Sequence, residues 1–143
     1  MEPSVARARL LSQHEGLRDR LGTMLALAER FRAGTTPEEE IIAALDALRD
    51  AFEEHNRFEE SLLEPMLRET DAFGEVRVAR MVGEHSEEHR AFMVFLGGPV
   101  DDVVRGLADF IEEIAAHMEA EERTFLHPAV LRDDVVAIDH SGA

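Results

Sequence analysis

The chain has no cysteine, no tryptophan and no tyrosine. Without cysteine there can be no disulfides, thiolate nucleophiles, iron–sulfur clusters or thiolate zinc sites. Without tyrosine or tryptophan, the chain lacks the side chains that usually store a radical beside a metal. These absences narrow the chemistry that the chain can carry.

Long apolar runs and clustered positive charges are also missing. No apolar run approaches the ~20 residues of a transmembrane helix, and the beginning, MEPSVARARLLSQHEG, becomes polar too soon for a signal peptide. The formal net charge is −16, with 31 acidic residues against 15 lysines plus arginines, so nucleic acid and anionic membranes are poor partners. We expect a soluble, cytoplasmic protein without such partners; the sequence leaves its oligomeric state open.

Four long segments carry apolar residues at helical spacing, and three short breaks separate them: AGTTP (33–37), ETDAFG (69–74) and GGP (97–99). Short connections between long helices make neighbours antiparallel. The sequence therefore predicts an all-α protein, an up-down-up-down four-helix bundle over residues 1–127. We expect the short C-terminal tail, residues 128–143, to lie on the surface or to pack loosely over one end.

The inward-facing stripe of each predicted helix is interrupted by polar side chains. On the fourth helix, for example, the stripe runs from Val103 to Thr124 with two polar positions within it. Helical spacing demands apolar residues at such positions in a bundle. Every helix contributes at least one of the seven interruptions, which are His14, His55, Glu59, His85, His89, His117 and Glu121.

Counting to the breaks tests whether these side chains share one level. His14 lies 19 residues before Ala33 and His55 lies 18 after Pro37. Glu59 lies 11 residues before Thr70, and His85 lies 11 after Gly74. The first two hairpins therefore predict one convergent site near the middle of the bundle.

The third hairpin is less regular. His89 lies only 8 residues before Gly97, whereas His117 lies 18 after Pro99. The two levels agree if residues 99–106, ending at Gly106, form a separate turn that caps the bundle before the fourth helix begins.

A buried cluster of five imidazoles and two carboxylates would be very unfavourable without a partner. A bound metal resolves this, because neutral imidazole and carboxylate are ligands for iron, zinc, copper or manganese. Seven ligands are too many for one ion, but two ions bridged by the carboxylates use all of them. The metal identity stays open at this point, and a metal-free structural bundle is the alternative.

The segments HNRFE (55–59), HSEEH (85–89) and HMEAE (117–121), preceded by a lone His14, resemble the hemerythrin-like, or HHE cation-binding, family over about residues 8–127. This resemblance implies a cofactor of two iron ions, an oxo- or hydroxo-bridged di-iron centre. It implies that His85, His89 and His117 hold one iron and that His14 and His55 hold the other. Glu59 and Glu121 would bridge, and dioxygen would bind at the iron with two histidines.

The oxygen-carrying members of the family usually close the last motif with Asp five residues after the histidine, a position that is Glu122 here. We favour Glu121 as the ligand, because four residues keep a side chain on the His117 face whereas five turn it ~140° away. Glu122 and Glu60 are expected on solvated faces, as is Glu113, unless it hydrogen-bonds a ligand imidazole. We expect His127 and His140 to be structural or exposed.

Five large apolar side chains lie about a turn above or below the cluster and are expected to form a dry wall around the site: Phe52, Leu62, Phe92, Ile114 and Phe125.

The ligand balance favours binding of dioxygen over splitting it, because five neutral nitrogens stabilise Fe(III) less than a cage of carboxylates does. The first hypothesis is reversible dioxygen binding for carriage, storage or sensing. Two others stay open: a di-iron enzyme acting on hydrogen peroxide or nitric oxide, and an iron- or oxygen-responsive interaction module.

Overall fold

A computed structural model describes residues 1–69, 74–131 and 133. Within these ranges the chain forms four helices and no strand: α1 (Pro3–Arg32), α2 (Glu38–Glu69), α3 (Gly74–Leu96) and α4 (Val100–Arg123). The all-α prediction is confirmed. None of the helices in the described ranges is both long and apolar enough to cross a membrane.

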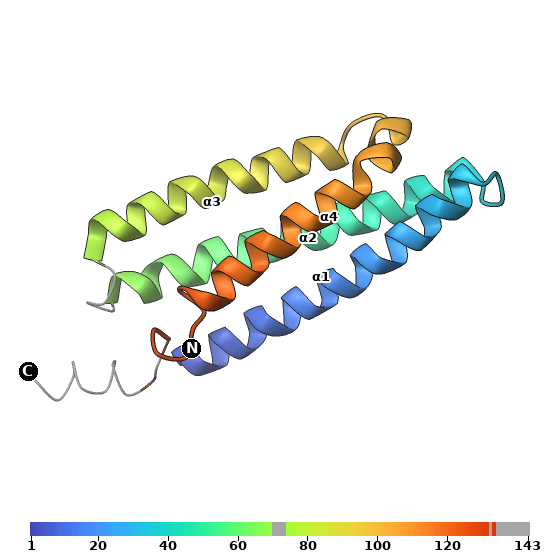
Figure 1. Cartoon of the computed structure of the whole chain (residues 1–143). Helices are drawn as coiled ribbons and strands as arrows, with labels where there is room; N and C mark the ends of the chain where they lie inside the picture. The colour runs from blue at the N-terminus through green and yellow to red at the C-terminus, as the bar shows by residue number, and fades with distance from the viewer. Residues whose placement is uncertain (70–73, 132, 134–143) are drawn as a thin grey trace, which may run out of the picture.

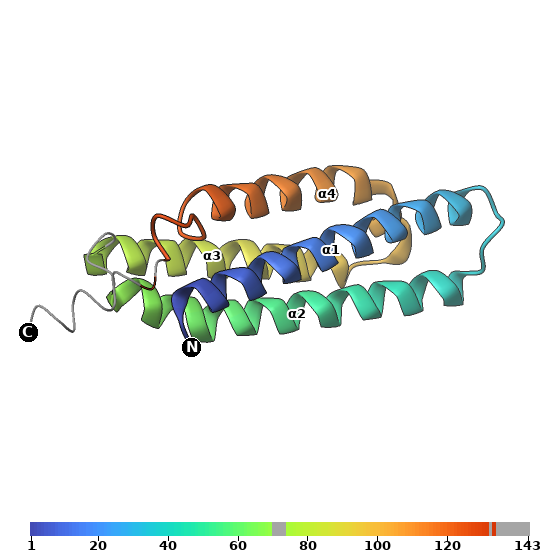
Figure 2. The ribbon, with the colours of Figure 1, turned by 90° about the horizontal axis from the view of Figure 1, so that it is seen from below.

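The helices run alternately up and down, as two perpendicular views show (Figures 1 and 2). α1 packs against α2 and α4, and α3 packs against α2 and α4. This is the predicted up-down-up-down order, which short connections between long helices enforce.

The first connection follows the predicted turn chemistry. α1 ends at Arg32 with two arginines in its last turn, and Gly34 follows with a φ of +77°. This left-handed conformation suits glycine, which has no Cβ to clash. The hydroxyl of Thr35 donates to the carbonyl of Arg30 (3.0 Å). Three glutamates in the first turn of α2 then face the positive end of that helix dipole.

The predicted separate turn over residues 99–106 is wrong. α4 is one continuous helix from Val100, and its first turns extend beyond the end of α3 (Figure 1). This overhang supplies the offset that the residue count required. Near the start of α4, Gly106 leaves room for the Phe95 ring, which would lie 3.0 Å from an added Cβ. The same ring stacks on Phe110, with 4.5 Å between ring centroids.

The other end of α4 also departs from the predicted stripe. Thr124, expected to face inward, is exposed, because the helix ends at Arg123. Its hydroxyl instead caps the helix by donating to the carbonyl of Ala120 (2.7 Å). The next residues, Phe125 and Leu126, turn into the core.

The core consists of two apolar clusters separated by a polar level. On α1, Leu17 belongs to one cluster and Leu10 to the other, with His14 between them. Met118 on α4 and Phe125, just after its end, bracket Glu121 in the same way. The polar residues are thus enclosed by apolar packing on both sides along the bundle axis.

The start of the predicted tail packs over the end of the bundle that holds the N-terminus. Leu131 is buried in the same cluster as Leu10. Ser4 donates to the Asp133 carboxylate from both its backbone N–H (2.9 Å) and its hydroxyl (2.6 Å). His140 lies outside the described residues.

Candidate metal centre

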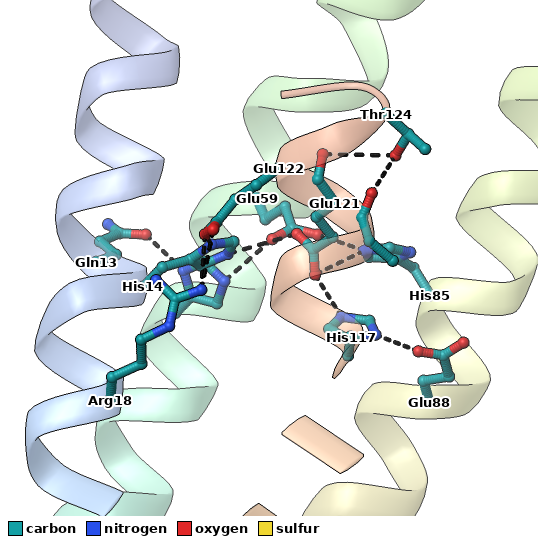
Figure 3. A network of polar contacts seen from close by, with 12 residues as sticks. Gln13, His14, Arg18, Glu59, His85, Glu88, His117, Glu121, Glu122 and Thr124 are labelled. Atoms are coloured by element: carbon teal, nitrogen blue, oxygen red, sulfur yellow. Dashed lines mark hydrogen bonds and ion pairs between the residues drawn. The ribbon is translucent and has the colours of Figure 1, made fainter. Parts of the chain in front are cut away.

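The structure brings the seven predicted side chains from all four helices to one level of the bundle. Figure 3 labels five of them, His14, Glu59, His85, His117 and Glu121. His14 is fully buried, and Glu59 and Glu121 are each 2% exposed. His55 and His89 are buried, whereas His85 and His117 are slightly more accessible, with side chains 14% and 9% exposed. The residue counts in the first two hairpins therefore predicted correctly that these side chains lie at the same height along the bundle axis.

The side chains form two groups that share one member. The first contains His85, His89, His117 and Glu121, and the second contains His14, His55, Glu59 and Glu121. Within each group, one potential ligand atom per residue lies within 4.8 Å of all the others. A shared carboxylate between two sets of ligands is the arrangement that a bridged pair of ions requires.

Glu121 lies at the centre of this arrangement. Its Oε2 is 3.5 Å from Nε2 of His14, and its Oε1 is 3.1 Å from Nε2 of His85. Oε1 also contacts Nε2 of His117, one helical turn earlier. The i, i+4 spacing places Glu121 on the His117 face, as the helical geometry predicts.

Glu59 connects the two groups from α2. Its Oε2 is 3.0 Å from Nε2 of His55, and its Oε1 is 2.8 Å from Nε2 of His85. Because His55 belongs to one group and His85 to the other, each oxygen of Glu59 faces a different set of ligands.

The buried polar atoms here fit a metal better than they fit one another. Nε2 of His14, His85 and His117, Nδ1 of His89, and both carboxylate oxygens of Glu59 and Glu121 are buried without a well-formed hydrogen bond. Leaving such a group unsatisfied costs roughly 1–3 kcal/mol. These atoms lie close together yet are poorly aligned for mutual hydrogen bonds, an arrangement that could hold a cation between them. The donor set of imidazole and carboxylate suits a transition metal.

The pKa values of the clustered side chains show that the carboxylates attract positive charge. Burial alone would lower the pKa of His85, but its close contacts with Glu121 and Glu59 and their negative charges raise it to about 10. Burial also acts to lower the pKa of His14 and of His117, yet contact with Glu121 raises both. Burial would raise the pKa of Glu121, yet the imidazoles hold it well below its usual range.

His89 is the exception, because burial lowers its pKa and the charges of His85 and His117 lower it further, against the pull of the carboxylates. Its imidazole is therefore neutral at neutral pH, which is the form that binds a metal.

The outer nitrogens of the histidines have partners that the sequence did not indicate. Nδ1 of His14 donates to Oε2 of Glu122 (3.0 Å), and Arg18 donates to both oxygens of the same carboxylate (2.9 Å each). Glu122, expected on a solvated face, thus orients a candidate ligand. A carboxylate can only accept, so this contact places the proton on Nδ1 and leaves Nε2 free to face Glu121.

Two further imidazoles are oriented in the same way. Nδ1 of His55 donates to Oε1 of Gln13 (2.7 Å), and Nδ1 of His117 donates to Glu88 (Figure 3). Nδ1 of His89 lies 3.5 Å from Oε1 of Glu60, which is itself half-exposed. The only sequence signal for Gln13, Glu88 and Glu122 is their position next to a candidate ligand in the chain.

Two other residues that the sequence brought into consideration lie outside this network. Glu113 is exposed. His127 is exposed, and its Nδ1 accepts a hydrogen bond from the backbone N–H of Ala129 (3.0 Å).

The expected apolar wall is present around the cluster. Phe52, Phe92, Ile114 and Phe125 are buried, and Leu62 is half-buried. The Phe125 ring lies 5.2 Å from that of His85, and the Phe92 ring lies 5.4 Å from that of His117, both centroid to centroid.

Comparison with known families adds an independent finding. The model of the hemerythrin HHE cation binding domain matches residues 5–129, a range that includes all seven side chains. No curated protein and no solved structure matches the chain.

Proposed function

Because the chain belongs to the hemerythrin HHE cation-binding domain family, we propose that it holds a non-haem di-iron centre that binds dioxygen reversibly, for carriage, storage or sensing. The observation that carries this proposal is the pair of four-residue groups that share Glu121. A single ion would leave one of the two groups without its cation. Cation binding is the family's property; iron and dioxygen are the proposal.

The two groups suggest how the residues divide the ions. His85, His89 and His117 would hold one iron, and His14 and His55 the other. Glu59 and Glu121 each contact histidines of both groups and would be shared. Two ferrous ions would supply the electrons that reversible dioxygen binding requires.

The chain's own residues keep the ions in place and limit side reactions. Glu122, Gln13 and Glu88 hold three of the imidazoles in the orientation that presents Nε2 inward. The phenylalanines against His85 and His117 exclude water from part of the cluster. No tyrosine or tryptophan is present to be oxidised.

A second candidate function is turnover of hydrogen peroxide or nitric oxide at the same centre. One observation favours it: a cavity lined by His85 and His117 opens between α3 and α4. Through this cavity a small reactant could reach the centre from solvent and its product could leave.

The test combines metal analysis with optical spectroscopy. The purified chain should contain two iron ions per molecule. Its reduced form should change spectrum in air and revert under vacuum, because a reversible binder releases its ligand. A single ion per chain, or a spectrum that does not revert, would contradict reversible binding at a di-iron centre. Many turnovers of peroxide or nitric oxide per site would instead support the enzyme.

A further inference from the structure

A cavity of about 640 Å³ lies between α3 and α4, the least closely packed of the neighbouring helices. Its inner wall includes His85, His117 and Glu121, which belong to the candidate centre. Phe92 and Phe125 are among the apolar side chains that form its sides. The cavity therefore connects the surface with atoms that are buried and make no well-formed hydrogen bond, namely Nε2 of both histidines and the oxygens of Glu121.

The lining of the cavity also carries more acidic than basic side chains, with the imidazoles of His85 and His117 as its only basic groups among the described residues. Its lining includes the carboxylates of Glu84, Glu88, Glu113 and Glu121, and no arginine or lysine among the described residues. Arg80 pairs with Glu84 (3.1 Å) from outside the lining and offsets one of these charges. A cleft lined by one sign of charge raises the local concentration of opposite ions and their rate of arrival.

We propose that this cavity is the route by which divalent cations reach the buried ligands, with Glu84, Glu88 and Glu113 attracting them at its rim. The inference rests on cation binding at the candidate centre but not on the identity of the ion or on dioxygen. The three rim carboxylates would thus attract cations on their way to the centre without being ligands of the bound ions.

The other openings beside the centre fit a cation less well. A hydrated divalent ion with six waters occupies roughly 200 Å³, if each water takes about 30 Å³. The hollow beside Glu59 and Glu64 measures about 20 Å³, which is too small. The hollow beside His55 measures about 200 Å³, and its lining balances Arg20 against Glu54.

The last opening, beside His89, measures about 370 Å³ and is large enough. Its lining carries Arg57 and Arg90 against Glu53 and Glu60, so the charges cancel. Among these four openings beside the centre, the α3–α4 cavity combines sufficient size with an excess of carboxylates, and the other three do not.

Blocking the cavity tests the route. Ala116 lines it, and Ala51 lines the hollow beside His55. Both are alanines within helices, so Ala116→Leu and Ala51→Leu add the same bulk at two different openings. The probe is Co²⁺ added to the full chain after chelation, followed by stopped-flow absorbance. Circular dichroism checks that each variant keeps its helical content.

Ala116→Leu should slow both uptake and release of Co²⁺ by the same factor, about tenfold, because an obstructed path delays passage in both directions. The dissociation constant should stay unchanged. Ala51→Leu should leave both rates as they are. Unchanged rates in Ala116→Leu, or equal slowing in both variants, would overturn the route while leaving the metal centre intact.

Removing rim charge provides a second test that alters no packing. Glu113→Gln should reduce the uptake rate about threefold at low salt and less at high salt. The reason is that salt screens the attraction between exposed charges, with a screening length of ~10 Å at 0.1 M. Glu29→Gln is the matched control: it removes the same charge from an exposed site on α1, about 22 Å along the helix from His14. Equal effects of the two substitutions would contradict guidance by the rim. If the unmodified chain took up no Co²⁺, the metal centre itself would be refuted, and the route with it.

Discussion

Replacing Glu121 by Gln should remove both metal ions, whereas the same change at Glu122 should weaken only one. Glu121 lies within 3.5 Å of imidazole nitrogens from α1, α3 and α4 and belongs to both ligand groups. Glu122 is one-quarter exposed, and the one candidate ligand that it contacts is His14, at the outer nitrogen of the ring. The substitution preserves the shape of the side chain and removes its charge, so the difference between the two variants reports on their positions.

The magnitudes follow from these positions. Loss of a group that orients a ligand typically weakens metal binding by about 10–100-fold, which is the effect expected for Glu122→Gln on the ion held by His14 and His55. Loss of Glu121 removes a direct ligand from both groups and should exceed that range. An ion present at 100 times its dissociation constant stabilises a protein by about 2.7 kcal/mol. For a chain of this size that corresponds to roughly 8 °C in Tm for each ion, so Glu121→Gln, which removes two ions, should forfeit roughly 16 °C.

The assay is the metal content per chain after dialysis against metal-free buffer, together with thermal unfolding with and without added metal. Glu119→Gln, an exposed position on the same helix, is the control and should retain both ions and the full metal-dependent Tm shift. If Glu121→Gln kept both ions while Glu122→Gln lost them, the assignment of the shared carboxylate would be refuted in favour of Glu122.

Three other outcomes are expected. His89→Ala should lose at least one ion, whereas His127→Ala, which changes an exposed histidine, should lose none; metal analysis compares the two, and full retention in both would count against the site. The pKa of His85 is raised to about 10. In the metal-free protein, the protonated His85 imidazole therefore contributes to the free energy of unfolding in full below about pH 6.5, and this contribution disappears as the pH rises to about 10. Urea unfolding over that pH window should therefore show a decline that His85→Ala lacks, and an equal decline in the variant would show that other groups cause it. Phe110→Ala should lower the free energy of unfolding by about 3–5 kcal/mol, because its ring packs against those of Phe52, Phe92 and Phe95; denaturant unfolding measures this, and an unchanged midpoint would refute the packing argument.

Much of the fold could be predicted because helical spacing and turn chemistry are local properties. The breaks at 33–37 and 97–99 lie where the helices end, since Gly34 and Pro99 act through their own backbone geometry. The extent of α4 could not be predicted in this way. In its first turns Gly106 packs closely against Phe95 from a different helix, a contact that no local pattern reveals.

In the candidate site, the potential ligands could be predicted from the sequence, but the residues that orient them could not. Residues such as His14 and Glu121 were identifiable because a polar side chain on an apolar stripe contradicts the helical pattern. Their partners Glu122 and Gln13 were not, because they occupy positions where polar residues are ordinary. Whether an outward-leaning carboxylate reaches the imidazole of another helix depends on the distance and rotation between helices, which spacing within one helix does not specify.

The sequence by itself determined the four helices, their alternating direction and the seven polar positions on the inward stripes, since each follows from the geometry of a single helix or a short connection. Only the tertiary structure decided which oxygen of Glu121 faces which imidazole, which side chains orient the imidazoles of the candidate ligands, and that a cavity with an excess of carboxylates opens between α3 and α4. The physical reason is that side-chain convergence and open space arise between helices, where the contributions of distant segments combine.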